Sequence, residues 1–412
     1  MKYGLIGEHL VHSFSKEVHR QIADYSYELC EIARDSLDKF MNEHNFTAIN
    51  VTIPYKQDVI PYLDHISDEA KAINAVNTII NRNGKLYGYN TDFFGMSALI
   101  SHIGISISGK KVLILGTGGT SKTAKAVVSH LGAKSVTIVS RKVGDGCVTY
   151  EEMYKNHTDA DVIINTTPVG MYPQNDTCPV DISYFPNLCG VVDAIYNPLR
   201  TKLVRNAKKM NIPAEGGLYM LVAQAVKASE IFLDKNYPDE TLEKIYEKVL
   251  TDKENIVLIG MPASGKTTIG KRLAKKLSRE LIDTDDEIVK KTKKTIPDIF
   301  KNEGEKKFRE YESRVISEIA TRNELIIATG GGSILKEENI DSLKQNGKLF
   351  FIDRPPEKLI PTSNRPLSSN KDAIYKRYNE RYEIYCRSAD IIINADTTVK
   401  EVEEKVIGEF YK

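Results

Sequence analysis

The sequence predicts an α/β protein built from three α/β units. Two glycine loops support this prediction, one starting at Gly116 and one at Gly260, because each follows an apolar run and precedes a helical pattern. The length points the same way: 412 residues exceed what one hydrophobic core ordinarily serves. We therefore expect two or three domains.

The first hundred residues alternate short apolar runs with amphipathic stretches. The apolar runs cover residues 3–6, 46–53 and 75–80, which indicates strands separated by helices. Asn83-Gly84 predicts a hairpin turn before Tyr87. Together these features predict an N-terminal α/β domain.

From residue 110 the apolar runs become regular, at residues 112–115, 136–139, 162–164 and 191–194. Each is followed by turn residues or a helical pattern, so a parallel sheet with right-handed crossovers is expected. Residues 217–235 form an apolar-faced helix that we expect to fold back on the first domain.

The segment 234–254 is highly charged and contains Pro238, and a new strand pattern starts at Ile256. We therefore predict four parts: residues 1–100 with the returning helix 217–235, residues 101–216, a helix and linker over 236–253, and a last domain over 254–412.

Composition excludes several classes of protein. The chain has a net charge of +1 and 41% hydrophobic residues. Neither half of the sequence has the excess of basic residues that is expected of a nucleic-acid binder. The five cysteines are scattered and form no C-x-x-C pair, which argues against a disulfide framework or a zinc site and favours a reducing cytoplasm. No run of 18 apolar residues and no signal peptide is found, so no membrane association is expected. A homodimer remains open.

The first glycine loop, residues 116–121 (GTGGTS), is of the dinucleotide-binding type. Ser121 replaces the third glycine and is still small enough for close helix packing. The next strand ends in Ser140, Arg141 and Lys142, with no carboxylate for a ribose 2′-hydroxyl. Two cations suit a 2′-phosphate, so NADP is favoured over NAD. The alternative is an ordinary basic turn.

Seven polar motifs surround this loop, at residues 12–15 (HSFS), 50–56 (NVTIPYK), 75–78 (AVNT), 88–92 (GYNTD), 165–171 (NTTPVGM), 193–198 (DAIYNP) and 217–224 (GLYMLVAQ). Singly, each is a turn or a cap. Together and in this order they resemble the shikimate dehydrogenase family over residues 1–235. The resemblance implies a substrate domain, a Rossmann NADP-binding domain and the reduction of 3-dehydroshikimate to shikimate.

The resemblance also implies roles for individual residues. Lys56 and Asp92 become the proton-transfer pair, because an ammonium beside a carboxylate can hold a ketone oxygen and donate to it. The implied substrate-binding residues are Ser13, Ser15, Thr52, Asn77, Asn90, Asp92, Tyr196 and Gln224. The implied NADP-binding residues are Gly116, Gly118, Gly119, Thr120, Ser121, Ser140, Arg141, Lys142, Asn165, Thr166, Ala194 and Gly217.

Three positions depart from the pattern of that family. His9 and Lys16 stand where prolines are usual, and Ser140 stands where asparagine is usual. None of these changes removes a reacting group, although Ser140 weakens the preference for NADP.

The second glycine loop, residues 260–267 (GMPASGKT), is a nucleoside-triphosphate loop. Backbone N–H groups of Ser264, Gly265 and Lys266 are expected to wrap the β-phosphate, with Lys266 reaching the β- and γ-phosphates. Thr267 is expected to coordinate Mg²⁺. The full set assigned to ATP is Gly260, Ala263, Ser264, Gly265, Lys266, Thr267, Thr268 and Arg365.

Downstream residues suggest the acceptor of the phosphoryl group. Asp283 and Asp285 lie at i and i+2 at a strand end, where an extended chain points both carboxylates the same way. One can serve magnesium and the other an acceptor hydroxyl, while the bland alternative is a helix N-cap. Arginines in residues 308–312 (FREYE) and 381–385 (RYEIY) can pair with a carboxylate, and the glycines of residues 328–332 (ATGGG) allow a flat ring to approach.

This set resembles shikimate kinase over residues 254–412, a P-loop α/β domain of the nucleoside-monophosphate-kinase type. The resemblance implies that Lys266 and Asp285 are catalytic and that Thr267 and Asp283 serve magnesium. It assigns the shikimate site to Asp285, Arg309, Gly330, Gly331, Gly332 and Arg381, and places Arg365 in a lid over ATP. Pro262-Ala263 replaces the usual Met-Gly, and residues 354–370 look short for a full lid.

The two resemblances predict consecutive reactions of the shikimate pathway, which leads to chorismate and the aromatic amino acids. NADPH reduction would yield shikimate, and ATP with Mg²⁺ would phosphorylate its 3-hydroxyl. Alternatives remain: a first half that prefers quinate, and a second half that acts on another hydroxy acid or only senses ATP. Channelling does not follow from a flexible linker.

Overall fold

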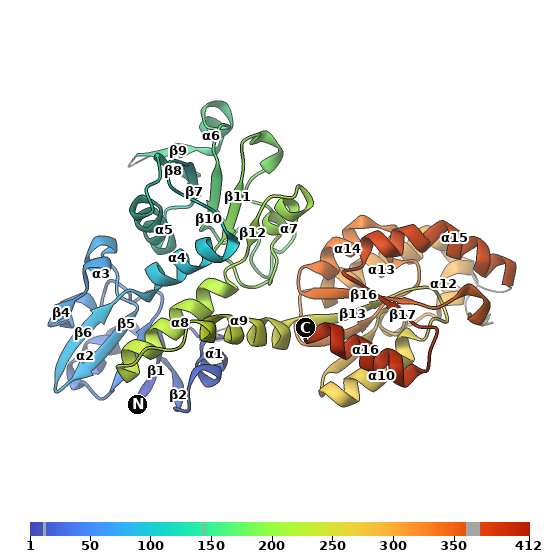
Figure 1. Cartoon of the computed structure of the whole chain (residues 1–412), viewed down its shortest axis with the longest axis horizontal. Coiled ribbons are helices and arrows are strands. Elements are labelled where there is room, and N and C mark those ends of the chain that lie inside the picture. The colour runs from blue at the N-terminus through green and yellow to red at the C-terminus, as the bar shows by residue number, and fades with distance from the viewer. Residues whose placement is uncertain (11–13, 143, 145, 360–370) are drawn as a thin grey trace. The chain divides into compact units, whose positions relative to one another are not determined.

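The computed structural model describes residues 1–10, 14–142, 144, 146–359 and 371–412. The chain divides into two compact units, Met1–Val249 and Leu250–Lys412 (Figure 1). The first unit holds two sheets and the second unit holds one. Among the described residues, no helix is both long enough and apolar enough to cross a bilayer.

The first sheet is mixed and has the strand order β2-β1-β3-β5-β6-β4. Asn83 and Gly84 both adopt positive φ (54° and 83°) in the turn that joins β5 to β6, so the predicted hairpin is confirmed. The strands are β1 (Tyr3–Gly7), β2 (Tyr27–Glu31), β3 (Ala48–Val51), β4 (His65–Ile66), β5 (Thr78–Arg82) and β6 (Lys85–Tyr89). The helices of this part are α1 (Ser15–Ile22), α2 (Leu37–Glu43), α3 (Asp68–Ile73) and α4 (Thr91–Ile103).

The second sheet is parallel throughout, with the order β12-β11-β10-β7-β8-β9. Its four inner strands are those predicted, and three of them (β7, β10 and β11) are rich in buried Val, Ile and Leu because helices cover both faces. The strands are β7 (Lys111–Leu115), β8 (Ser135–Ser140), β9 (Cys147–Thr149), β10 (Val162–Asn165), β11 (Gly190–Asp193) and β12 (Ala214–Glu215). The helices are α5 (Gly119–His130), α6 (Tyr150–Asn156) and α7 (Lys202–Lys209).

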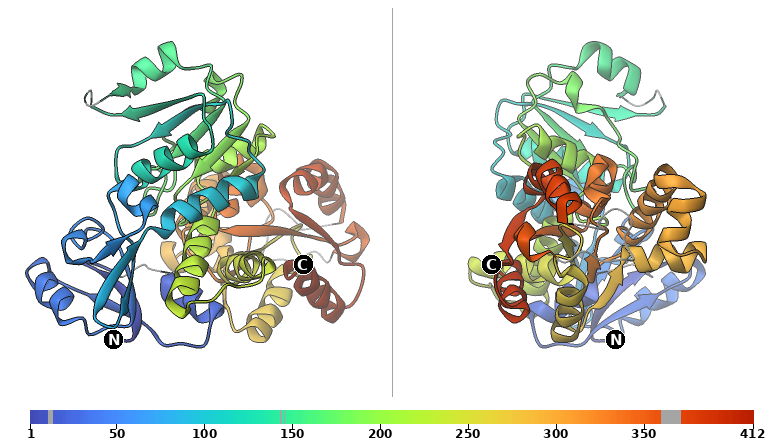
Figure 2. Two further views of the ribbon diagram at one scale, coloured as in Figure 1. Left: turned by 60° about the vertical axis from the view of Figure 1, so that its left-hand side comes forward. Right: turned by 90° about the vertical axis from the view of Figure 1, so that its right-hand side faces the viewer.

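Helices α4 and α8 (Leu218–Leu233) lie side by side between the two sheets (Figures 1 and 2). The far end of α8 reaches the first sheet, where Phe232 stacks on Tyr3 with ring centroids 5.7 Å apart. Helix α9 (Glu240–Lys253) follows, and its Glu243 accepts a hydrogen bond from the Tyr219 hydroxyl of α8 (3.2 Å).

The second unit is a five-stranded parallel sheet with the order β14-β15-β13-β16-β17. Alternate residues of its strands face opposite layers of helices: Ile256 and Leu258 pack toward α10 and α16, and Val257 and Ile259 toward α11, α12, α13 and α15. The strands are β13 (Asn255–Ile259), β14 (Glu280–Asp283), β15 (Leu325–Ala328), β16 (Gly347–Asp353) and β17 (Ile391–Asn394). The helices are α10 (Lys266–Leu277), α11 (Thr284–Thr292), α12 (Ile296–Asn302), α13 (Gly304–Ile319), α14 (Glu337–Lys344), α15 (Lys371–Ser388) and α16 (Val399–Phe410).

Candidate active sites

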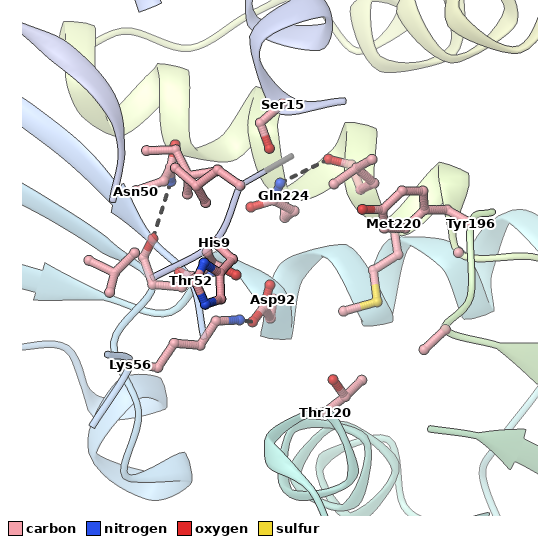
Figure 3. A pocket seen from close by; sticks show the side chains of 17 residues that line it. His9, Ser15, Asn50, Thr52, Lys56, Asp92, Thr120, Tyr196, Met220 and Gln224 are labelled. Atoms are coloured by element: carbon pink, nitrogen blue, oxygen red, sulfur yellow. Dashed lines mark hydrogen bonds and ion pairs between the residues drawn. The ribbon is translucent and has the colours of Figure 1, made fainter. Parts of the chain in front are cut away.

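A cavity of about 590 Å³ lies in the first unit, bounded by β3, α4, α8 and the first glycine loop. Figure 3 shows that most of its polar side chains are neutral amides and hydroxyls. Of the residues predicted for substrate, those in its wall are Ser15, Thr52, Asn77, Asp92, Tyr196 and Gln224, and the predicted catalytic residue Lys56 lies there too. Of those predicted for NADP, the wall includes Thr120, Ala194 and Gly217.

One ion pair lies in this wall. Lys56 follows β3 in a turn and Asp92 lies in the first turn of α4, and Lys56 Nζ is 2.6 Å from Asp92 Oδ2. The two side chains are 27% and 18% exposed, so both are reachable from the cavity yet largely desolvated. Figure 3 shows them pointing toward one another, with Thr120 facing the cavity from α5. The Lys56–Asp92 pair can hold and protonate an oxygen atom of a ligand that occupies the cavity.

Asn77 is oriented by a buried hydrogen-bond network. Its Oδ1 accepts from the Thr91 N–H (2.7 Å) and from the Thr78 hydroxyl (3.1 Å), which leaves the amide nitrogen as the group for a ligand. Asn50 donates to the Thr78 hydroxyl (3.0 Å) and accepts from the Tyr27 hydroxyl (2.7 Å). Asn50 also lines the cavity and was not assigned from the sequence, although it belongs to the NVTIPYK motif.

Helix α8 contributes Met220, Leu221 and Gln224 to the wall. Gln224 Nε2 donates to the Leu221 carbonyl (3.0 Å), and its Oε1 accepts from the Thr91 hydroxyl (3.3 Å). Met220 and Leu221 were not assigned from the sequence because apolar residues on a helix read equally well as core. His9, noted only as a departure from the family pattern, lines the cavity as well.

Of the residues predicted for substrate, one described residue, Asn90, is not in this wall. Asn90 is the N-cap of α4, where its Oδ1 accepts from the Phe93 N–H (3.3 Å) and its amide donates to the Ala75 carbonyl (2.9 Å). The structure shows the local role of an asparagine before a helix at this position, and substrate binding by Asn90 stays a prediction. Ser13 lies outside the described residues.

The first glycine loop joins β7 to α5, whose N-cap is Gly118. A side chain at Gly118 or Gly119 would meet nothing within 4 Å, so this backbone is open to a bound group. Gly116 is different: it has φ +107° and packs against Thr166. Ser121 lies in the first turn of α5 and is buried. The N–H groups at the start of α5 can therefore hold phosphate.

At the end of β8, Arg141 and Lys142 are both exposed. The Ser140 hydroxyl accepts a hydrogen bond from the Lys142 N–H (3.2 Å), which fixes the turn locally. One exposed guanidinium group and one exposed ammonium group next to a dinucleotide loop suit the binding of an additional phosphate.

Asn165 is completely buried, and its amide donates to Asp193 Oδ1 (3.0 Å). Asp193 also accepts from the Thr201 hydroxyl (2.7 Å) and the Ile195 N–H (3.1 Å). Burial raises the pKa of Asp193 to about 7, although these hydrogen bonds oppose the change. The Asn165–Asp193 pair fixes the loop that carries Ala194 and Tyr196. Nearby, the Thr166 hydroxyl donates to the Leu115 carbonyl (2.6 Å).

In the second unit, the second glycine loop joins β13 to α10. Lys266 Nζ lies over the loop and donates to the carbonyls of Gly260 (2.8 Å) and Met261 (2.9 Å). The Thr267 hydroxyl donates to Asp283 Oδ2 (2.7 Å). Ala263 has φ +66°, a left-handed backbone in which glycine is usual, so the replacement of glycine here is accommodated at some cost in strain. The loop also includes Ser264 and Gly265, and Thr268 lies in the first turn of α10.

Asp283 and Asp285 do not share an extended chain. Asp283 ends β14 and is the N-cap of α11, accepting from the Asp285 N–H (3.0 Å), so Asp285 already belongs to the helix. The N-cap interpretation of Asp283 therefore holds, because a carboxylate stabilises the free N–H groups of a helix start.

The three glycines after β15 pack tightly against the predicted acceptor residues. A Cβ on Gly330 would lie 2.8 Å from Asp285 Oδ1, and a Cβ on Gly332 would lie 2.3 Å from the Arg309 guanidinium. Arg381 Nη1 donates to the Gly331 carbonyl (2.9 Å). The structure thus brings together Asp285, Arg309, Gly330, Gly331, Gly332 and Arg381. Arg365 lies outside the described residues.

Arg309 is held by two carboxylates. Its guanidinium donates to Glu312 Oε2 (2.8 Å) and Glu305 Oε1 (3.0 Å), and Glu312 is completely buried and accepts from the Ser333 hydroxyl (2.7 Å). Burial lowers the pKa of Arg309, but these carboxylates outweigh it and raise the pKa. Glu312 was not assigned from the sequence; its position one helical turn after Arg309 is the signal that could have identified it.

Comparison with known proteins finds a matching family for each of the two units. Residues 5–79 match the model of the shikimate dehydrogenase substrate binding domain, and residues 262–411 match the model of shikimate kinase. A shikimate dehydrogenase (NADP(+)) of Clostridium beijerinckii is 40% identical over 264 residues, covering 59% of this chain and 96% of that protein. One from Methanosphaera stadtmanae is 35% identical, covering 58% and 94%.

Solved structures give the same result for the first unit. The crystal structure of shikimate dehydrogenase 1 from Peptoclostridium difficile is 38% identical with a TM-score of 0.55, covering 60% of this chain and 98% of that one. The Thermus thermophilus enzyme in complex with NADP(H) and shikimate is 26% identical with a TM-score of 0.54, covering 60% and 99%. The chain therefore belongs to the shikimate dehydrogenase family and continues into a shikimate kinase domain, so it is a fusion of the two.

Proposed function

We propose that the first unit reduces 3-dehydroshikimate to shikimate with NADPH, and that the second unit phosphorylates the 3-hydroxyl of shikimate with ATP and Mg²⁺. The observation that carries the first half is the Lys56–Asp92 pair, 2.6 Å apart in a cavity that Thr120 of the dinucleotide loop also lines. The curated relatives named above are described as NADP(+) enzymes, and the Thermus structure contains NADP(H) and shikimate.

In the dehydrogenase half, the reduced nicotinamide supplies a hydride when bound. Lys56 would hold the ketone oxygen and donate a proton as negative charge develops there, with Asp92 keeping the ammonium in place. Neutral donors and acceptors such as Asn77 and Gln224 suit a polyhydroxy acid, because they bind hydroxyl groups without adding charge. Arg141 and Lys142 would hold the 2′-phosphate and favour NADP over NAD.

In the kinase half, ATP supplies the phosphoryl group when bound. Thr267 and Asp283 offer hard oxygen ligands 2.7 Å apart, and Mg²⁺ at such sites takes one or two protein ligands together with phosphate and water. Within the described residues no cluster of three acidic, histidine or cysteine side chains forms a complete metal site, which suits magnesium carried in with the nucleotide. Asp285 would accept the proton of the acceptor hydroxyl, and Arg309 and Arg381 would pair with the substrate carboxylate.

We also propose domain boundaries, a cellular compartment and an order for the two reactions. Residues 1–100 with the helix 217–235 would be the substrate domain, residues 101–216 the NADP domain, 236–253 a connecting helix and 254–412 the kinase. All five cysteines are unpaired, which suits a reducing cytoplasm. The two reactions would be consecutive steps toward chorismate and the aromatic amino acids.

The test of the kinase half is incubation of the purified protein with shikimate, ATP and Mg²⁺. ADP formation that requires shikimate is expected. If no ADP forms while NADP-linked oxidation of shikimate is normal, the proposed shikimate kinase activity is wrong, which leaves another hydroxy acid as acceptor or nucleotide sensing as the role of this domain. Replacing shikimate by quinate in both assays separates the alternative of a quinate preference, and measuring oxidation with NADP and NAD separately tests the cofactor assignment.

A further inference from the structure

We infer that Arg354 is a phosphate-binding residue of the kinase domain and pairs with the β-phosphate of the bound nucleotide. This inference rests on the proposed nucleotide site at the second glycine loop. Neither the family pattern followed above nor the loop itself assigns a role to this arginine.

The fold places Arg354 beside the glycine loop. Strands β13 and β16 are parallel neighbours, with Ile259 opposite Phe351 in register (Figure 1). Their carboxyl ends therefore meet at the same edge of the sheet, where β13 continues into the glycine loop and β16 continues into Arg354. The contact is close: a Cβ on Gly260 would lie 2.8 Å from the Ile352 carbonyl oxygen.

The guanidinium reaches the part of the loop that starts α10. Arg354 Nη1 lies 3.9 Å from the position of a Cβ on Gly265, which is the N-cap of α10. The N-terminus of a helix carries partial positive charge, and cations are favourable at the opposite end. Lys266 Nζ lies over the same loop. Three sources of positive charge thus converge here, an arrangement that a bound phosphate would neutralise.

No carboxylate compensates Arg354 in the part of the chain that the structure describes. Its Nε is buried and has no hydrogen-bond partner. The adjacent Asp353 accepts from the Tyr378 hydroxyl (3.1 Å), and Asp283 accepts from Thr267. A buried donor without a partner is unfavourable in a folded protein, so it points to a group that binds there.

The position along the loop selects the phosphate. The N–H groups of residues 264–266 are those that wrap the β-phosphate in loops of this type, and Arg354 approaches Gly265, the middle one of the three. A charge-assisted hydrogen bond from a guanidinium to this phosphate would contribute to the binding of ADP and ATP but not of AMP.

The test is calorimetric titration of the full chain with ATP, ADP and AMP, without shikimate. Arg354→Gln should weaken ADP and ATP by a similar factor of about 10 and leave AMP unchanged. Arg354→Lys should recover part of the loss. Lys358→Gln is the matched control: it removes the same charge four residues along, at a lysine paired with Asp396, and should leave all three nucleotides unchanged.

Three results would overturn the inference: no change on Arg354→Gln, an equal loss for all three nucleotides, or a loss confined to ATP. An equal loss would indicate general damage to the fold, which a thermal melt of each variant would reveal independently. Because the readout is binding, it is separate from turnover. Arg354-dependent ADP binding by a protein that does not phosphorylate shikimate would retain this inference and remove the proposed kinase activity.

Discussion

The two glycine loops of this chain use glycine for different reasons. In the first loop, Gly118 and Gly119 border open space, so the absence of side chains leaves the backbone free for a ligand. In the second loop, Gly260 packs against the Ile352 carbonyl. Pro262 of the same loop packs against Gly331, one of the three glycines after β15, where a Cβ on Gly331 would lie 2.6 Å away. Glycine there allows protein segments to approach one another. The open loop suits a long dinucleotide, and the crowded loop suits an acceptor held close to a phosphoryl group.

The charges around the two loops differ in the same sense. The dehydrogenase cavity has one Lys–Asp pair among neutral groups, whereas the kinase site gathers arginines and acidic side chains around its glycines. A hydride acceptor needs one proton donor, and a phosphoryl transfer must balance several charges. Because both sites lie in one polypeptide, each activity serves as an internal control for changes made in the other.

The largest effect is expected from Lys56→Ala. Lys56 would give the proton to the ketone oxygen in reduction and take it from the hydroxyl in oxidation, so its loss should lower kcat of shikimate oxidation by about 10²–10⁴-fold, while the kinase rate stays unchanged. Lys71→Ala, which removes an exposed lysine of α3, is the matched control. Steady-state kinetics across pH would check this. Wild-type kcat in Lys56→Ala would mean that the ion pair is structural only.

Lys266→Ala should be the counterpart in the second unit. Removing a cation from the phosphates is expected to lower kinase turnover by about 10²–10³-fold and to leave NADP reduction as it was. Lys271→Ala, on the exposed face of the same helix, should change neither rate. Equal losses of both activities would contradict the separation of the two sites.

A smaller change is expected when Arg141 and Lys142 are both replaced by alanine. If they bind the 2′-phosphate, kcat/KM for NADP should fall by about 10-fold and that for NAD should stay constant. Lys134→Ala, on the same subdomain, controls for the loss of surface charge. Parallel assays with the two cofactors measure the ratio, and an unchanged ratio would leave these residues as an ordinary basic turn.

The smallest effect concerns the pH dependence of stability. The folded pKa of Asp193 is raised to about 7 from an ordinary value of 3.8. The folded state therefore keeps a proton that the unfolded state has lost, so the stabilisation is full below pH 4 and is lost as pH rises through 7. Asp193→Asn should remove this trend, which amounts to about 1.4 kcal/mol per pH unit between pH 4 and pH 7, or a few degrees per pH unit in the melting temperature of the first unit. The melting temperatures of the wild type and of Asp193→Asn are measured from pH 5 to pH 8. If both change with pH in the same way, the raised pKa of Asp193 is wrong.

The sequence was sufficient for the central strands and much less so for the edges. Strands such as β7 and β10 are buried on both faces and leave continuous apolar runs. The edge strands β9 and β12 have three and two residues and leave no such pattern. The motifs supplied most of the cavity wall. Asn90 caps α4 in addition, because an asparagine before a helix can accept a hydrogen bond from a local N–H group. Asn50 and Arg354 were not assigned, since their neighbours come from segments that only the fold brings together. Glu312 was overlooked, although it lies one turn after Arg309 on the same helix.

The central claim is that the product of one site is the substrate of the other. The most direct measurement supplies 3-dehydroshikimate, NADPH, ATP and Mg²⁺ to the purified protein and follows NADPH oxidation and ADP formation together. We expect one ADP for each NADPH oxidised, with no ADP when NADPH is omitted. Oxidation of NADPH without ADP formation, or ADP formation that does not depend on NADPH, would contradict the account.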